Sequence, residues 1–181
     1  MSRRDEVLLA ALDLLDEVGL EDLTTRRLAE RLGVQPSAMY RHFASKQALL
    51  DAMVEHLATV ADGPVPDGDW SEQLRRIAEE SRNGMLRVRD GARLIATHRT
   101  PGPAAIAAFD QLTAMLHATG LPEPIARSAV DTVICYVNGF TIEEQSRRPA
   151  APTRTRADKD ADFRAGLELI ITGIRCSLPV G

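Results

Sequence analysis

The sequence predicts an all-α fold in two parts, an N-terminal three-helix domain with helix-turn-helix spacing and a longer C-terminal helical domain. Apolar residues recur at helical spacing in almost every segment, and we find no convincing alternating strand or short hairpin turn. Glycines and prolines fall mainly between these periodic segments, where helices end. The 181 residues are 44% hydrophobic and 27% charged, an ordinary globular composition that requires neither disulfides nor a metal for folding.

Composition excludes several classes of protein. The longest apolar run is only a few residues, too short for a spanning helix, so no membrane partner is expected. Acidic residues within the first 17 positions argue against a secretory signal, and we expect a cytoplasmic protein. Cys135 and Cys176 are too few for a disulfide scaffold and lack the CxxC spacing of zinc sites. Because both lie among apolar helix positions, we expect buried thiols.

The charge of the chain is unevenly distributed. The net charge is −4, which by itself argues against a nucleic-acid partner. Between Thr24 and Lys46, however, five basic residues stand against the single acid Glu30, so this segment carries +4 and the rest of the chain −8. A basic patch on an acidic body is a typical electrostatic footprint of a nucleic-acid-binding surface.

Four helices are expected before the first long break. Gly19 ends the first, Thr24 caps the second, Gly33 closes the second, and Ser45 caps the fourth. The first helix contains the apolar positions from Leu8 to Val18, and the expected ranges of the other three are about 24–32, 36–43 and 47–61.

The break at 62–69 holds two prolines, two glycines and three acids, a composition that cannot propagate a helix. The helices expected beyond it are 70–88, 90–98, 104–119, 122–145 and 160–177, with a solvated loop over 147–159. Gly166 and Gly173, on one side of the last helix, predict the close approach of another backbone.

The second and third helices, joined by the turn at 33–35, have the spacing of a helix-turn-helix. In that motif the start of the second helix faces base edges in the major groove. Met39 and Phe43, one turn apart, are expected to pack inward, which leaves Ser37, Tyr40, Arg41 and His42 facing outward. The small residues Ser37 and Ala38 would let the helix approach DNA closely.

Three side chains suit particular DNA contacts. Tyr40 and Lys46 suit phosphate oxygens, and Arg26 suits either a phosphate or a guanine. A small helical bundle whose arginines only solvate its surface has the same spacing, so spacing alone leaves DNA binding open.

A family resemblance favours DNA binding. The run Leu23 to Val34, followed by Tyr40 to Leu50, resembles the N-terminal domain of TetR-family transcriptional regulators, over about the first 50 residues. The resemblance implies a domain at 1–46 that binds a double-stranded DNA operator. Together with the spacing it gives these candidate DNA-binding residues: Thr25, Arg26, Gln35, Pro36, Ser37, Ala38, Tyr40, Arg41, His42 and Lys46.

The remaining chain resembles the C-terminal domain of the tetracycline repressors at Trp70, at 89–92 and at 166–173. The resemblance implies an effector-binding and dimerisation domain at 47–181, with helix 47–61 linking the two domains. In that family the long eighth helix and the last helix form a four-helix dimer interface. The apolar face of the last helix gives the candidate interface residues Leu167, Ile170, Ile171 and Ile174.

The tetracycline pocket of this family is polar, with an Asn that anchors the drug and a His that binds its magnesium. This sequence has Ile77 and Ile95 at the matching positions, and neither can hold a chelated cation. We therefore expect a largely apolar effector, no metal and no cofactor, although the same residues could form a filled core. The candidate effector-binding residues are Ile77, Ser81, Ile95, His98, Arg99, Phe109, Leu112, Ile134, Asn138 and Glu143.

The expected function is a homodimeric, ligand-responsive DNA-binding repressor that reads a palindrome with half-sites about 34–36 Å apart. An effector would act by shifting the fourth helix. An enzyme is not expected, because His98 and His117 lack partners at catalytic or metal-binding spacing. A protein-interaction module with a vestigial helix-turn-helix, and an activator instead of a repressor, remain alternatives.

Overall fold

The computed structural model describes residues 2–59, 69–97, 102–146 and 155–179. All regular structure in these ranges is helical, which confirms the predicted all-α class. The helices are α1 (Arg3–Val18), α2 (Thr25–Arg31), α3 (Pro36–Met39), α4 (Lys46–Thr59), α5 (Trp70–Met85), α6 (Gly91–Thr97), α7 (Pro103–His117), α8 (Glu123–Ser146) and α9 (Arg156–Cys176). None of these helices is both long enough and apolar enough to cross a membrane.

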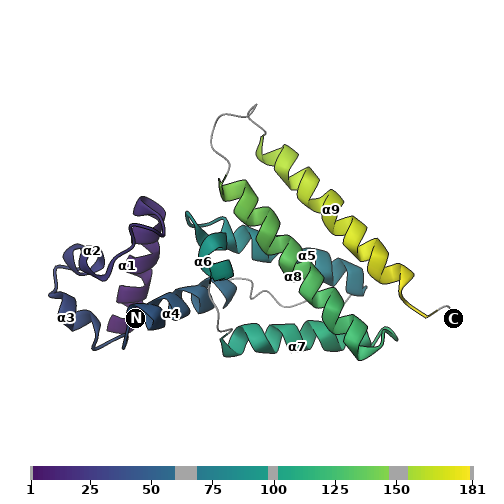
Figure 1. Cartoon of the computed structure of the whole chain (residues 1–181), viewed down its shortest axis with the longest axis horizontal. Helices are drawn as coiled ribbons and strands as arrows, with labels where there is room; N and C mark the ends of the chain where they lie inside the picture. Colours follow the sequence, from purple (N-terminus) through teal and green to yellow (C-terminus); the bar gives the residue numbers. More distant parts are fainter. Residues whose placement is uncertain (1, 60–68, 98–101, 147–154, 180–181) are drawn as a thin grey trace.

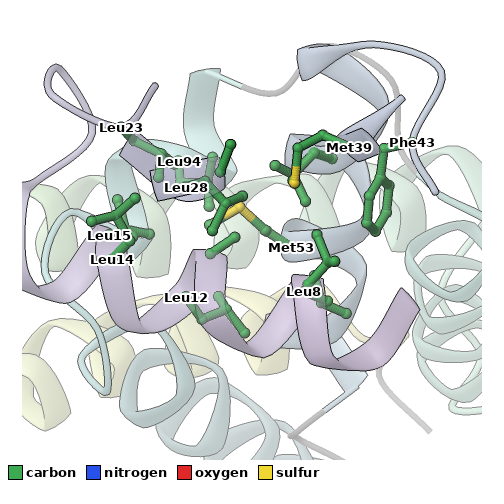
Figure 2. Close-up of a cluster of buried hydrophobic side chains, with 14 of the residues drawn as sticks. Leu8, Leu12, Leu14, Leu15, Leu23, Leu28, Met39, Phe43, Met53 and Leu94 are labelled. Carbon is green, nitrogen blue, oxygen red and sulfur yellow. The ribbon is translucent and has the colours of Figure 1, made fainter. Parts of the chain in front are cut away.

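The first three helices and α4 enclose an N-terminal core (Figure 1). Leu8 and Leu15 of α1 meet Leu28 of α2, Phe43 beyond α3 and Met53 of α4 (Figure 2). All five side chains are buried, so α1, α2, α3 and α4 share one continuous apolar interior. This core fixes the orientation of α2 and α3.

A second core lies among α5, α7, α8 and α9. The two long helices α8 and α9 run side by side in opposite directions (Figure 1). Leu74 of α5, Val130 of α8 and Phe163 of α9 are fully buried in it. Tyr136 stacks on Phe163, donates a hydrogen bond of 2.9 Å to its carbonyl oxygen, and lies directly over Gly166. A side chain at 166 would collide with that ring, so Tyr136 of the same chain explains one of the two glycines on α9.

Helix α6 joins the two cores. Leu94 is buried in the N-terminal core, Ala92 in the C-terminal core, and Ile95 packs against both. The turn before α6 is held on both sides. On one side the backbone N–H of Leu20 donates to the Asp90 carboxylate at 2.8 Å. On the other, the Gln145 side chain accepts from the N–H of Ala92 and donates to two carbonyl groups near the end of α5.

Three expectations on helix extent and exposure were wrong. Helix α9 begins at Arg156, inside the loop expected over 147–159, because Thr155 and Asp158 form a capping box; residues 147–154 lie outside the described ranges. Helix α3 ends at Met39, and Arg41 and His42 then donate to carbonyl groups three residues back. Cys135 and Cys176 are both exposed, since each lies on the outer side of its helix.

Candidate nucleic-acid interface and effector region

The turn between α2 and α3 has the geometry that the sequence predicts. Gly33 adopts a φ of +64°, in the left-handed region that favours glycine. The N–H of Val34 returns to the Ala29 carbonyl at 3.0 Å, and Gln35 is extended as the N-cap of α3. Pro36 occupies the first turn, where its missing N–H costs no hydrogen bond. These bonds fix the angle at which α3 leaves α2.

The two faces of the recognition segment, residues 36–43, differ as expected. Met39 and Phe43 are buried in the N-terminal core, which confirms that they pack inward. Tyr40 is 54% exposed on the opposite side. Of the ten candidate DNA-binding residues, the structure leaves Arg26, Gln35, Pro36, Ser37, Tyr40, Arg41 and Lys46 exposed, and Thr25, Ala38 and His42 partly buried.

Several arginines of this domain already have acidic partners. Arg26 lies 3.0 Å from Glu30, and Arg31 lies 2.7 Å from Glu17. The hydrogen bond with Glu17 raises the pKa of the Arg31 guanidinium. Within the described part of the domain, Arg41 and Lys46 form no ion pair. They are therefore free to meet DNA phosphates, while Arg26 must first leave Glu30.

Comparison with known proteins agrees with this geometry. A family model described as bacterial regulatory proteins of the tetR family matches residues 7–53, and one described as tetracyclin repressor-like, C-terminal domain, matches residues 63–157. The chain is 38% identical over 193 residues to the tetracycline repressor protein class A from transposon 1721 of Escherichia coli, covering 93% of this chain and 88% of that protein. The chain belongs to the TetR family.

Two solved TetR-family structures resemble the whole chain. BioQ with its natural double-stranded DNA operator superposes with a TM-score of 0.81 at 35% identity, over 96% of this chain and 98% of that chain. A variant of TetR from Acinetobacter baumannii AYE, in complex with minocycline, gives 0.87 at 35% identity, over 99% of this chain and 100% of that chain. The predicted family and the predicted DNA-binding regulator are thus confirmed.

The structure places the candidate effector residues around the C-terminal core. Ile77 and Ser81 of α5, Ile95 of α6 and Asn138 of α8 are partly buried. Phe109 and Leu112 of α7 pack against the core cluster. Ile134 is 39% exposed and Glu143 is exposed. His98 and Arg99 lie outside the described residues.

Most of the candidate interface residues of α9 point into their own protomer. Leu167, Ile171 and Ile174 are buried in the C-terminal core, and Ile170 is partly buried. The outer side of α9 carries Leu169, which is 77% exposed, and Gly173, which has no atom within 4 Å of the position a Cβ would take. A groove of about 310 Å³ runs between α8 and α9 on this side, with Ile125, Thr132, Ile170 and Gly173 among its lining.

A buried ionic cluster ties three helices together at the far end of the C-terminal core. The Arg82 side chain, only 4% exposed, donates to both carboxylate oxygens of Glu144, at 2.9 and 3.1 Å, and to Asp160 at 2.7 Å. Its guanidinium also lies over the Phe163 ring. The hydrogen bond from Arg82 lowers the pKa of Asp160. We call Arg82, Glu144 and Asp160 the Arg82 cluster.

Sequence reasoning missed this cluster and the bridging role of Gln145. The partners of Arg82 lie 62 and 78 residues from it in the sequence, and Gln145 lies 60 residues from its partner Met85. No local spacing therefore reveals these contacts. Among the described residues, no group of three potential metal ligands is brought together.

Proposed function

We propose that this chain is a homodimeric transcriptional repressor that binds a palindromic DNA operator and is released by a small, largely apolar effector. The observation that carries the proposal is the recognition segment, which turns Met39 and Phe43 into the core and leaves Ser37, Tyr40 and Arg41 outside. The operator-bound relative BioQ, similar over 96% of this chain, supports the same use of the surface here. We place the domain boundary at 46/47, with α4 as the link.

The outer side of α8 and α9 is the proposed dimer interface. Along α8, Ile125, Ser128, Thr132 and Cys135 alternate at spacings of three and four, so they share one stripe. On α9 the stripe through Leu169 and Gly173 lies alongside it. The buried residues Leu167, Ile171 and Ile174 support this face from within, and Ile170 reaches its edge. A second copy would cover exposed apolar side chains that otherwise stand in water.

The proposed effector site lies in the C-terminal core between α5, α7 and α8. Apolar Ile77, Phe109 and Leu112 would form most of its wall, and Asn138 would supply a polar contact. With isoleucines at 77 and 95, we propose that the effector is not a tetracycline–magnesium complex. The minocycline-bound relative supports a ligand site in this domain.

Helix α6 offers a route from this site to the DNA-binding domain. Ile95 contacts both cores, and the turn before α6 is bonded through Asp90 to Leu20, just after α1, and through Gln145 to α8. A ligand that displaces Ile95 would move α6 against α4 and change the separation of the two recognition segments. Coupling of this kind is typically about 1–3 kcal/mol and reciprocal, so DNA must weaken effector binding by the same factor.

The test is a DNA-binding assay with the full chain. We expect the protein to select a palindromic duplex from a random-sequence pool and to retard it as a complex with two protomers. Compounds that raise the melting temperature in a screen of apolar ligands should release that duplex. Failure to form any specific complex at low salt would overturn the proposal and favour a protein-interaction module.

The dimer has its own test. Leu169→Lys places a charge on the proposed interface and should give a monomer by sedimentation, with an operator affinity reduced at least tenfold. Ile106→Lys is the matched control. Ile106 is also a large aliphatic side chain that is exposed, at 51%, but it lies on α7 and not on α8 or α9. If both variants remain dimeric, the interface lies elsewhere.

A further inference from the structure

The first turn of α1 lies against the end of the recognition segment, although 39 residues separate them in sequence. The Cζ atom of Arg4 is 4.8 Å from the centre of the Phe43 ring, within the range of a cation–π contact. Phe43 directly follows His42 and precedes Lys46 by three residues. The fold therefore brings a cation of α1 beside the end of the recognition segment, a short distance along the chain from Lys46.

Helical geometry explains why Arg4, and not its neighbour, reaches this surface. Arg4 lies one turn before Leu8, on the stripe of α1 that packs on the N-terminal core. Leu8 and Phe43 lie at the same end of that core (Figure 2). Arg3 points along a different side of the helix, where its guanidinium lies 2.5 Å from Glu6.

The charges of the domain single out the same residue. Arg3, Arg26, Arg27 and Arg31 each form an ion pair with a carboxylate of the domain. Among the described residues up to position 46, Arg4, Arg41 and Lys46 form none. The acid beside Arg4, Asp5, is held by the backbone and hydroxyl of Ser2, which lower its pKa, so it is committed to the helix cap.

We propose that Arg4 binds a DNA phosphate and extends the contact surface of Tyr40 and Lys46 onto α1. Stacking on Phe43 occupies the face of the guanidinium and leaves the N–H donors at its edge free for a bidentate phosphate contact. The ring also restricts the side chain before DNA arrives, which reduces the entropy lost on binding. The inference rests on the proposed function, since it requires that the recognition segment meets DNA.

The test measures operator affinity between 50 and 200 mM salt for the wild-type protein, Arg4→Ala, Arg4→Lys and Arg3→Ala, using a duplex selected by the wild-type protein. One lost phosphate contact lowers the salt slope by about 0.9, so a dimer of Arg4→Ala should lose about 1.8. Its fall in affinity over this salt range should therefore be about tenfold smaller than that of the wild type. Arg3→Ala removes the same charge from the neighbouring, paired position and should change the slope far less.

Two further readouts define the contact. Arg4→Lys keeps the charge but loses the planar stack, so it should keep most of the slope and bind a few-fold more weakly. Arg4→Ala should weaken binding equally on the selected duplex and on a duplex with an altered half-site, because phosphates carry no sequence information.

The outcomes distinguish this inference from the proposed function. If the wild type selects and binds a duplex but Arg4→Ala and Arg3→Ala have the same slope, the phosphate contact is wrong and the repressor proposal stands. A change in sequence preference would also overturn it, because that would place Arg4 on a base edge. If the wild type selects no duplex, the proposed function itself fails. Unchanged melting temperatures confirm that the variants fold.

Discussion

The two ends of this molecule use arginine in opposite ways. In the DNA-binding domain, Arg26, Arg27 and Arg31 form ion pairs at the surface, with side chains between 34% and 83% exposed. In the C-terminal core, Arg82 is buried and shared between two carboxylates. An exposed ion pair stabilises the fold by only about 0–1 kcal/mol, so its members can exchange partners. Removing one member of a buried ion pair is costly, because it leaves the other charge buried and unpaired.

This difference fits the task of each region. A DNA-binding surface must exchange its carboxylate partners for phosphates, and weak pairs permit that exchange. The Arg82 cluster instead joins α5 to the last turn of α8 and the first turns of α9, so it fixes the helices that carry the proposed interface.

The largest expected effect comes from removing the buried cation. Arg82→Met should destabilise the protein by about 3–5 kcal/mol, because it removes both hydrogen bonds to the buried Glu144 carboxylate and leaves it only the looser ion pair with Lys159 at 3.9 Å. Chemical denaturation followed by circular dichroism measures the change in unfolding free energy. The control is Arg164→Ala, which removes the exposed pair of Arg164 with Glu79 and should cost less than about 1 kcal/mol. Equal losses for the two variants would contradict the contrast between the regions.

The next effect concerns a free cation of the DNA-binding surface. Lys46→Ala should leave stability nearly unchanged but reduce the salt slope of operator binding by about 1 per protomer, uniformly across sequences. Fluorescence anisotropy at several salt concentrations measures the slope. Arg164→Ala again serves as the control, since it removes the same charge far from the recognition segment. An unchanged slope for Lys46→Ala would show that this lysine does not contact phosphate.

Acid should affect the Arg82 cluster through Asp160. Arg82 lowers the pKa of Asp160 in the folded state, so the ionised carboxylate stabilises the fold above the usual aspartate pKa of 3.8. That stabilisation is lost as the pH falls through the lowered folded-state value. Asp160→Asn should therefore cost stability at pH 6 and show a smaller drop in melting temperature between pH 6 and pH 3 than the wild type. Parallel melting curves for the two proteins would contradict this assignment.

Local signals in the sequence predict most of the fold. The caps at Thr24 and Thr155 and the turn at Gly33 each depend on residues within a few positions of one another. The cap at Thr24 and the turn at Gly33 were predicted, and the capping box at Thr155 was overlooked although its signal is equally local. The inward face of the recognition segment follows from the one-turn spacing of Met39 and Phe43. Such features need no knowledge of the rest of the chain.

Contacts between distant segments could not be predicted. The stack of Arg4 on Phe43, the Arg82 cluster and the bridge made by Gln145 each join residues that only the tertiary fold brings together. The apolar positions of α9 illustrate the same limit. Periodicity identifies Leu167 and Ile171 as an apolar face, but it does not say whether that face meets its own protomer or a second one.

The smallest expected effect tests the exchange of partners directly. Arg26 and Glu30 form an i,i+4 pair on α2, so DNA binding by Arg26 must break a contact worth about 0.3–0.5 kcal/mol. Glu30→Gln removes that competitor and a negative charge near the phosphates, and it should tighten operator binding about two- to threefold in the anisotropy assay. Glu79→Gln makes the same charge change at the Arg164 pair in the C-terminal domain and should leave the affinity unchanged. Weaker binding by Glu30→Gln would mean that Glu30 holds Arg26 in its DNA-binding position. The exposed pair would then have a fixed structural role, like that of the Arg82 cluster, and the contrast between the two regions would fail.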